Sequence, residues 1–191
     1  EVQQFKPGDE VFGDLSASGF GGFAEFTPVP EKVLARKPSN LTFEEAAALP
    51  LAAITALQGL RNKGNIRSGQ EVLINGASGG VGGYAIQIAK AYEAQVTAVC
   101  STSKMENARQ QGADEVIDYT IQDFINSGKR YDLIFDIVAN YGLNAVSRVL
   151  KPKGHYVSCA FSPQTLLLGP LKSMLSGKKL VSLIANANQA D

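Results

Sequence analysis

The glycine-rich segment "NGASGGVGG", residues 75–83, is the part of the sequence whose residue types and spacing best suit ligand chemistry. It lies between the apolar run "EVLI" and the stretch "YAIQIAKAY", which predict a strand followed by a helix. A glycine-rich turn at such a junction lets backbone N–H groups approach a diphosphate closely, and the helix N-terminus adds unpaired N–H groups and a positive dipole end. The segment therefore predicts a site for a ligand that carries a diphosphate.

The spacing within this segment follows the fingerprint of dinucleotide sites, except that Ala77 stands where the first glycine is usual. Gly79 would allow the close approach of the ligand, and Gly82 would let the helix pack tightly on the strand. Two alternatives are a glycine-rich turn that binds nothing and a site for a mononucleotide or S-adenosylmethionine.

Regular alternation of strands and helices from Ser68 onward would position this loop. Several of the strands are apolar throughout, which is typical of a parallel sheet covered on both faces. We therefore expect an α/β, doubly wound parallel six-stranded Rossmann sheet, and its two mononucleotide-type halves favour a dinucleotide. The predicted strands are 71–76, 95–100, 114–119, 131–138, 155–161 and 179–185, and the predicted helices are 79–92, 104–112, 121–128, 140–154 and 170–178.

The first part of the chain has a different texture, with glycine, proline and short alternating runs. The runs at 9–14, 21–30 and 32–38 predict short antiparallel strands joined by turns. A helix capped by Thr42 follows, and Pro50 should end or kink it. We expect two domains, 1–45 and 46–191, the second of them binding the dinucleotide.

The end of the second predicted strand indicates which dinucleotide would bind. NAD sites place an acidic residue there for the ribose hydroxyls, whereas this chain has no carboxylate before Glu106. A 2′-phosphate would instead meet Ser101, Thr102, Ser103 and then Lys104. These residues favour NADP (NADPH) over NAD, although Lys104 alone is equally typical of a solvated lysine at a helix start.

Four motifs, "FKPGDEVFG…GGFAEF", "FEEAAALPLAAITALQGL", "GASGGVGGYAIQIAK" and "GADEVIDY", occur in the order seen in a known family. The chain resembles the medium-chain dehydrogenase/reductase superfamily, and within it the zinc-independent quinone oxidoreductase (zeta-crystallin-like) branch, which includes alkenal and enone reductases. Members are longer at both ends. The resemblance thus implies that residues 1–45 are part of a GroES-like catalytic domain and that the chain is truncated at both ends.

The resemblance also implies roles for residues at the adenosine half of the cofactor. Ser103 and Lys104 would meet the 2′-phosphate, and Tyr119 would pack or hydrogen-bond beside the adenosine. An ordinary strand-end tyrosine is the alternative for Tyr119. The residues implied at the diphosphate are Ala77, Ser78, Gly79, Gly80, Val81 and Gly82.

At the nicotinamide half, the resemblance implies that Val138 and Ala139 border the ribose and that Ala160 and Phe161 approach the nicotinamide. Thr55 would lie under the nicotinamide or beside the substrate. A helical threonine bonded back to its own backbone is the alternative for Thr55.

The sequence offers little for a metal site. It has two cysteines, Cys100 and Cys159, which end apolar runs and are expected to be reduced thiols, and a single histidine, His155. Where zinc-dependent relatives carry a cysteine ligand the chain has Leu51, and their four-cysteine lobe has no counterpart between Asp14 and Gly21. We expect no zinc.

The implied reaction is hydride transfer from NADPH to a quinone or an α,β-unsaturated carbonyl. No catalytic residue is assigned, and His155 is interpreted as a surface or core residue. No tyrosine has a lysine four residues later, which argues against a short-chain dehydrogenase, and the second strand lacks the acid that a methyltransferase would offer. A redox-sensing or structural NADPH-binding protein without turnover remains the open alternative.

The composition of the chain limits which classes of partner it can bind. Eighteen basic residues balance eighteen acidic ones, so nothing attracts nucleic acid or an anionic membrane, and no apolar stretch reaches the ~20 residues of a membrane span. The last strand is too apolar to stay open as an edge, so we expect a homodimer through it, in the cytoplasm. Its apolar residues are Leu180, Val181, Leu183 and Ile184.

Overall fold

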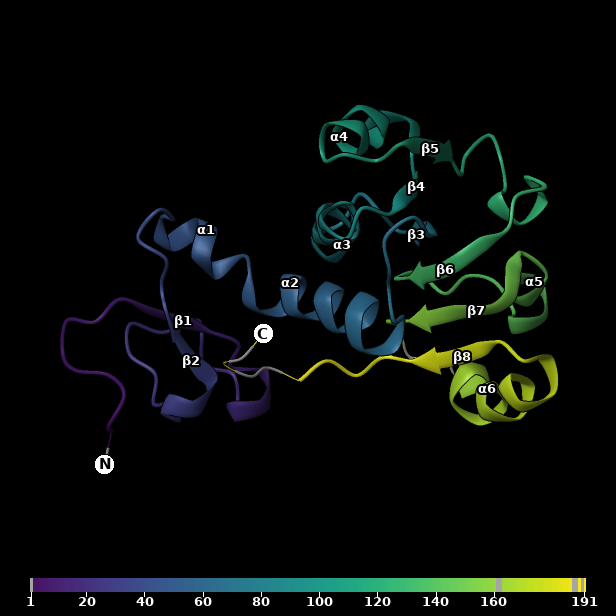
Figure 1. Ribbon diagram of the computed structural model, residues 1–191. Helices are drawn as coiled ribbons and strands as arrows, with labels where there is room; N and C mark the ends of the chain where they lie inside the picture. The colour runs from purple at the N-terminus through teal and green to yellow at the C-terminus, as the bar shows by residue number, and fades with distance from the viewer. Residues whose placement is uncertain (1, 161–162, 187–188, 190) are drawn as a thin grey trace. The chain divides into compact units, whose positions relative to one another are not determined.

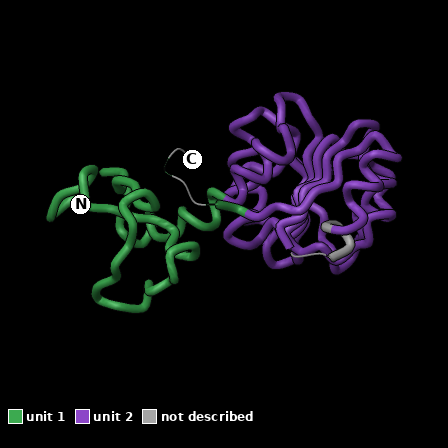
Figure 2. Tube along the Cα trace, turned by 90° about the horizontal axis from the view of Figure 1, so that it is seen from below, with its two compact units in different colours: residues 1–54, 185–191 green, residues 55–184 purple. Residues whose placement is uncertain are grey.

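The computed structural model describes residues 2–160, 163–186, 189 and 191. The chain divides into two compact units, Glu1–Ile54 with Ala185–Asp191, and Thr55–Ile184 (Figure 2). Each unit is described below by itself.

The larger unit is built on a six-stranded sheet (Figure 1). The strand order is β5-β4-β3-β6-β7-β8, and every neighbouring pair is parallel. This confirms the predicted doubly wound α/β sheet. The strands are β3 Glu71–Asn75, β4 Gln95–Cys100, β5 Glu115–Asp118, β6 Tyr131–Asp136, β7 Leu150–Ser158 and β8 Lys179–Ser182.

Helices cover both faces of this sheet because its strands are apolar on both faces. In β3, Val72 and Ile74 pack into one buried cluster and Leu73 into the other, as the two-residue period of a strand requires. The first cluster includes residues of η3, α3 and α4, and the second includes residues of η5 and α5. The helical segments of this unit are η3 Gln58–Lys63, α3 Gly80–Ala91, η4 Thr102–Lys104, α4 Met105–Gln110, η5 Phe124–Asn126, α5 Leu143–Arg148 and α6 Pro163–Ser176.

Three predicted helices were wrong in extent. The helix expected over 170–178 begins earlier, since α6 runs from Pro163 to Ser176 with Pro170 inside it. The helix expected over 140–154 ends at Arg148, and residues 150–158 form β7 instead. Strand pairing resumes beyond "KPKG" because an irregularity in the register loops these residues out, with Lys153 in the left-handed region at φ 61°. The helix expected over 121–128 is a single turn, Phe124–Asn126, capped by the Asp123 carboxylate.

The smaller unit contains two short strands, and β1 Val11–Gly13 pairs antiparallel with β2 Leu34–Arg36. The strand expected over 21–30 was wrong: this segment has no strand, and its Phe23 and Phe26 side chains are exposed. The alternation there resembled a strand, but a strand forms only where a partner can pair with it, and three successive positive φ angles at residues 19–21 turn the chain just before it. The short helical turns here are η1 Ser16–Ser18 and η2 Glu31–Val33.

The helical region that follows confirms its sequence signals. Thr42 caps α1 Phe43–Ala47 in a capping box with Glu45. This helix ends before Pro50, which is the first residue of the next helix, α2 Pro50–Leu57. Among the helices in the described ranges, none is long and apolar enough to cross a membrane.

Candidate cofactor site

The glycine-rich segment lies where the chain reverses its direction across the sheet. β3 pairs with β4 on one side and with β6 on the other, so the carboxyl ends of β3 and β6 flank a topological switch point. A cavity of about 250 Å³ opens there, lined by Asn75, Gly76 and Ser78 on one side and by Val138 and Asn140 on the other. Open α/β sheets bind ligands in a crevice at this place.

Residues 76–79, here called the glycine loop, connect β3 to α3. Gly76 has φ 88°, and the N–H groups of Gly76 and Ala77 donate to the Val99 carbonyl, which ties the loop to β4. Gly79 is the N-cap of α3 and offers no side chain to the N–H groups of the first turn. The exposed part of the segment is residues 78–80, whereas Ala77 and Gly82 are buried and Val81 is half-buried. The exposed residues 78–80 thus present a helix N-terminus suited to an anion.

The space around two glycines shows why each lacks a side chain. A Cβ on Gly82 would lie 2.6 Å from Ala77 Cα and closer still to the Gly76 carbonyl oxygen, so only glycine lets α3 pack on the loop. A Cβ on Gly79 would meet nothing nearer than Gly76 O at 3.8 Å, which is ordinary contact. The fold therefore has room for a side chain at 79, and its absence leaves a cradle for a ligand. The loop fits the diphosphate of a dinucleotide.

The residues expected at the 2′-phosphate follow the carboxyl end of β4. Ser101 is half-buried, and Thr102, Ser103 and Lys104 are exposed in η4. Tyr119, directly after β5, is 61% exposed and also lines the cavity. The residues expected at the adenosine side thus follow the carboxyl ends of the paired strands β4 and β5.

A carboxylate that the sequence analysis did not consider lies among them. Asp118 ends β5 and pairs in register with Cys100, so it sits beside the end of β4. It accepts hydrogen bonds from the Thr102 hydroxyl and from the Thr120 hydroxyl and N–H. The Thr102 hydroxyl, then that of Thr120, hold the pKa of Asp118 below its usual range. The Thr102 hydroxyl therefore already donates its hydrogen bond to an acceptor within the protein. In-register pairing of the two strand ends was the signal that would have found Asp118.

The nicotinamide-side residues follow β6 and β7. Val138 is 51% exposed at the cavity, and Ala139 next to it has φ 54°. Ala160 is half-buried, and its carbonyl accepts a hydrogen bond from Ser158 Oγ at 3.0 Å. Phe161 lies outside the described residues. Thr55, in α2, is half-buried and is not among the residues that line this cavity.

The thiols and the histidine have environments that suit packing. Burial and the charge of Asp136 raise the pKa of Cys159 to about 12, and burial raises that of Cys100. Burial lowers the pKa of His155, whose Nδ1 contacts the Gly64 carbonyl. The thiols are thus poor nucleophiles at neutral pH.

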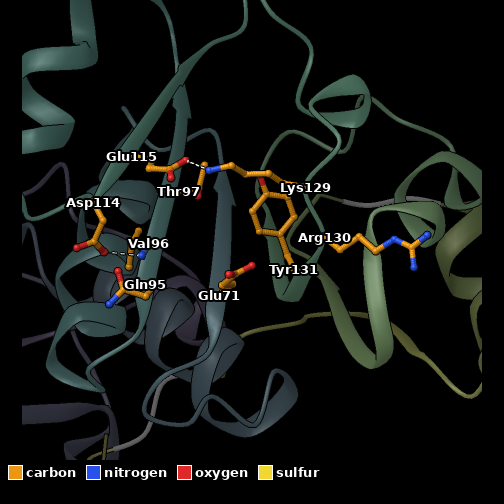
Figure 3. A pocket seen from close by; sticks show the side chains of 9 residues that line it. All are labelled: Glu71, Gln95, Val96, Thr97, Asp114, Glu115, Lys129, Arg130 and Tyr131. Carbon is orange, nitrogen blue, oxygen red and sulfur yellow. Dashed lines mark hydrogen bonds and ion pairs between the residues drawn. The ribbon is translucent and has the colours of Figure 1, made fainter.

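A second cavity of about 250 Å³ lies at the amino-terminal ends of the strands, opposite the crevice (Figure 3). It is lined by residues that begin the strands, among them Glu71, Gln95 and Tyr131, and an ion pair of Lys129 with Glu115 crosses it. Parallel sheets bind ligands at the carboxyl ends of their strands, so this cavity is not the candidate cofactor site.

Metal ligands are sparse in the part of the chain that the structure describes. Across residues 2–160, 163–186, 189 and 191, no three His, Cys, Asp or Glu side chains are grouped so that they could hold a metal ion.

Comparison with known proteins gives a consistent result. Residues 80–190 match the model of the family described as "Zinc-binding dehydrogenase". The chain is 43% identical to 2-methylene-furan-3-one reductase of Solanum lycopersicum over 82% of its length, and 39% identical to NADPH-dependent alkenal/one oxidoreductase, chloroplastic, of Arabidopsis thaliana over 82%. It spans 42% of the length of each of these two relatives.

Among solved structures, the quinone oxidoreductase from Coxiella burnetii superposes with a TM-score of 0.80 at 28% identity. The match covers 98% of this chain and 59% of that one. The structural match therefore includes residues of both units of the chain.

Proposed function

The chain belongs to the zinc-binding dehydrogenase family, in the quinone oxidoreductase-like branch of the medium-chain dehydrogenase/reductase superfamily, and on this premise we propose that it binds NADPH and delivers a hydride to a quinone or an α,β-unsaturated carbonyl compound. The substrate classes come from the names of the relatives. Because the chain spans less than two thirds of their length, the activity is proposed for the protein to which these residues belong.

One observation carries the proposal: the glycine loop occupies the switch point of the sheet, and its exposed glycine, Gly79, leaves room that the fold itself does not need. In the proposal, residues 78–80 hold the diphosphate, with Ser78 and Gly80 donating through their backbone N–H groups, since the Gly79 N–H already donates to the Gly76 carbonyl. The turn of residues 137–140 borders the nicotinamide ribose, and residues 101–104 with Tyr119 border the adenosine.

The chemistry divides between cofactor and protein. When bound, the dihydronicotinamide supplies a hydride, that is, a proton with two electrons. The protein holds it beside the electrophilic carbon of the substrate, and the proton that completes the reduction comes from water. Cys159 and Tyr156 keep their own protons because burial and the nearby Asp136 charge raise the pKa of both.

Preference for NADPH over NADH is part of the proposal and rests on Lys104, Ser101 and Ser103. Lys104 is exposed, so its ammonium group is free to meet a 2′-phosphate. Asp118 opposes this preference by its charge, but its carboxylate is buried and already accepts three hydrogen bonds from Thr102 and Thr120.

Reaction without zinc is also proposed, although the family description names the metal. The support is Leu51 at the position of a cysteine ligand, together with the sparse metal ligands of the described residues.

Self-association is proposed through β8, the edge strand of the sheet. Leu180 and Leu183 are buried within the unit, whereas Ile184 is 79% exposed just beyond the strand. Pairing with β8 of a second copy would satisfy its free edge. A cytoplasmic location stays a prediction, and one relative is chloroplastic by name.

The cofactor assignment is tested by titrating the protein with NADPH and with NADH. The fluorescence of the reduced nicotinamide reports the binding. We expect NADPH to bind at least ~10-fold more tightly, equal to about 1.4 kcal/mol. Lys104→Ala should abolish this difference, and Lys32→Ala, which removes an exposed lysine of the smaller unit, should preserve it. Consumption of NADPH at 340 nm with a benzoquinone or a 2-alkenal then tests the reaction. Binding of neither nucleotide would overturn the proposal.

A further inference from the structure

A buried carboxylate, Asp136, accepts hydrogen bonds from Asn75 and Val138, two residues that line the crevice. It is the last residue of β6 and is 0% exposed. Its Oδ1 accepts hydrogen bonds from Asn75 Nδ2 at 2.8 Å, from Val138 N at 3.1 Å and from Ala139 N at 2.8 Å. Its Oδ2 accepts one from the Tyr156 hydroxyl at 3.0 Å. A buried carboxylate with this many donors is costly to remove because each donor would lose its partner.

The four donors join three neighbouring strands at the ends that face the ligand. Asn75 ends β3, Val138 and Ala139 follow β6, and Tyr156 belongs to β7. In the sheet, Asn75 pairs with Asp136, and Asp136 pairs in turn with Ser158 of β7. The carboxylate thus links the strand before the glycine loop to the turn after β6.

That turn has a backbone conformation that needs support. Ala139 has φ 54°, in the left-handed region that residues with a Cβ seldom adopt, and such strain persists only where the surroundings hold it. The two backbone N–H groups that donate hydrogen bonds to Asp136 belong to Ala139 and to the residue before it. The carboxylate is therefore placed to hold the strained turn.

The same turn packs against the glycine loop. A Cβ on Gly76 would lie 2.9 Å from Val138 Cγ2 and 3.3 Å from Ile137 Cβ, so the two segments are in close contact. Asn75 Nδ2 also donates to Asn140 Oδ1 at 3.1 Å, which adds a second link between them. A movement of the turn would consequently change the width of the crevice between residues 76–78 and 138–140.

We infer that Asp136 is a positioning residue that holds the turn of residues 137–140 against the glycine loop and so sets the geometry in which the nicotinamide half of the cofactor binds. It does so through Val138 and Ala139 and does not itself touch the ligand. The inference rests on the proposed function. Residues 101–104 and Tyr119 lie at other strand ends, so binding of the adenosine half does not depend on this turn.

Two ligands separate the halves: NADPH, and adenosine 2′,5′-bisphosphate, which carries the adenosine end with its 5′-phosphate but lacks the nicotinamide ribose and ring. In Asp136→Ala we expect the dissociation constant of NADPH to rise ~10-fold and that of the bisphosphate to stay within about twofold. Ala139→Gly in the same chain should recover most of the NADPH affinity, because glycine adopts the left-handed conformation without support. Ile134→Val, a buried change in the same strand, should lower the melting temperature without altering either dissociation constant.

Asp136→Asn serves if the alanine variant does not fold. The amide oxygen can still accept the three donors, and its NH₂ group can donate to the Tyr156 hydroxyl, but the bonds lose the added strength of a charged acceptor. We expect a rise of about threefold for NADPH alone, again reversed by Ala139→Gly. Equal weakening of both ligands, no weakening of NADPH, or no rescue by Ala139→Gly would overturn the inference. A wild-type chain that binds neither ligand would overturn the proposed function as well.

Discussion

Two glycine-to-alanine changes in the same segment should have opposite consequences. At Gly82 the added Cβ would lie 2.6 Å from Ala77 Cα, whereas ordinary contact begins near 3.4 Å. The loop backbone would have to withdraw by at least this difference, about 0.8 Å, and by more at the Gly76 carbonyl oxygen, or the helix start would shift. Both obstructing groups are backbone, so no side chain can swing aside to make room.

The size of the effect follows from two opposing contributions. Overpacking of this kind costs about 1–3 kcal/mol, and alanine regains about 0.5–1 kcal/mol over glycine within a helix. Because both obstructing groups are backbone, the upper part of the overpacking range, about 2–3 kcal/mol, applies, and Gly82→Ala should lower the free energy of unfolding by about 1–2.5 kcal/mol. For a chain of this size that corresponds to a melting temperature lower by about 2–10 °C.

At Gly79 the expectation is reversed, because the Cβ finds ordinary contact within the protein. Gly79→Ala should keep the melting temperature within about 2–3 °C of the wild type, since a changed N-cap costs about 1 kcal/mol. Its Cβ would occupy the approach of the diphosphate, and NADPH should bind ~10-fold more weakly. Circular dichroism melts and NADPH fluorescence titrations measure the two effects. A Gly82→Ala protein that melts with the wild type, or a Gly79→Ala protein that binds NADPH like it, would refute the reasoning.

Three further changes test other parts of the structure. Thr42→Ala removes the capping box of α1 and should cost about 0.5–2 kcal/mol in a denaturant melt of the chain. Burial lowers the pKa of His155, so the unfolded chain binds that proton more readily; the free energy of unfolding should fall as the pH drops below about 6.5, and His155→Gln should flatten this slope in melts between about pH 5 and 7. The lowered pKa of Asp118 stabilises the fold above about pH 4 and ceases to do so as the pH falls through its folded value, so Thr102→Val, which removes the first cause of that shift, should move the acid-unfolding midpoint to higher pH.

The sheet was predictable from the sequence because its strands carry a local signal. Residues 72–74 and 133–135 are apolar on both faces, which a helix-covered parallel sheet requires, and the glycine loop marks the first junction. The alternation of strands with helices then leaves little choice of topology, since crossovers between parallel strands are right-handed. The parallel six-stranded sheet and the place of the glycine loop at its first strand–helix junction followed from these rules.

Features that depend on pairing between distant segments were not predictable in this way. Asp118 becomes relevant only because β5 pairs in register with β4, and Asp136 only because β3, β6 and β7 end together. The residues "SRVL" favour a helix that continues past Arg148. Leu150 is a strand residue instead, because it pairs with Tyr131 of β6. The mixture of apolar and polar residues in 21–30 resembled a strand, but the segment forms none, because such a pattern records a burial preference and supplies no partner strand.

Hydrogen exchange with and without NADPH, read by mass spectrometry on the full chain, tests most directly where the cofactor binds. The account predicts slower exchange in residues 76–83 and 137–140, and no change in residues 129–131, which line the cavity at the opposite edge of the sheet. Protection at residues 129–131 without protection of the glycine loop would contradict the account.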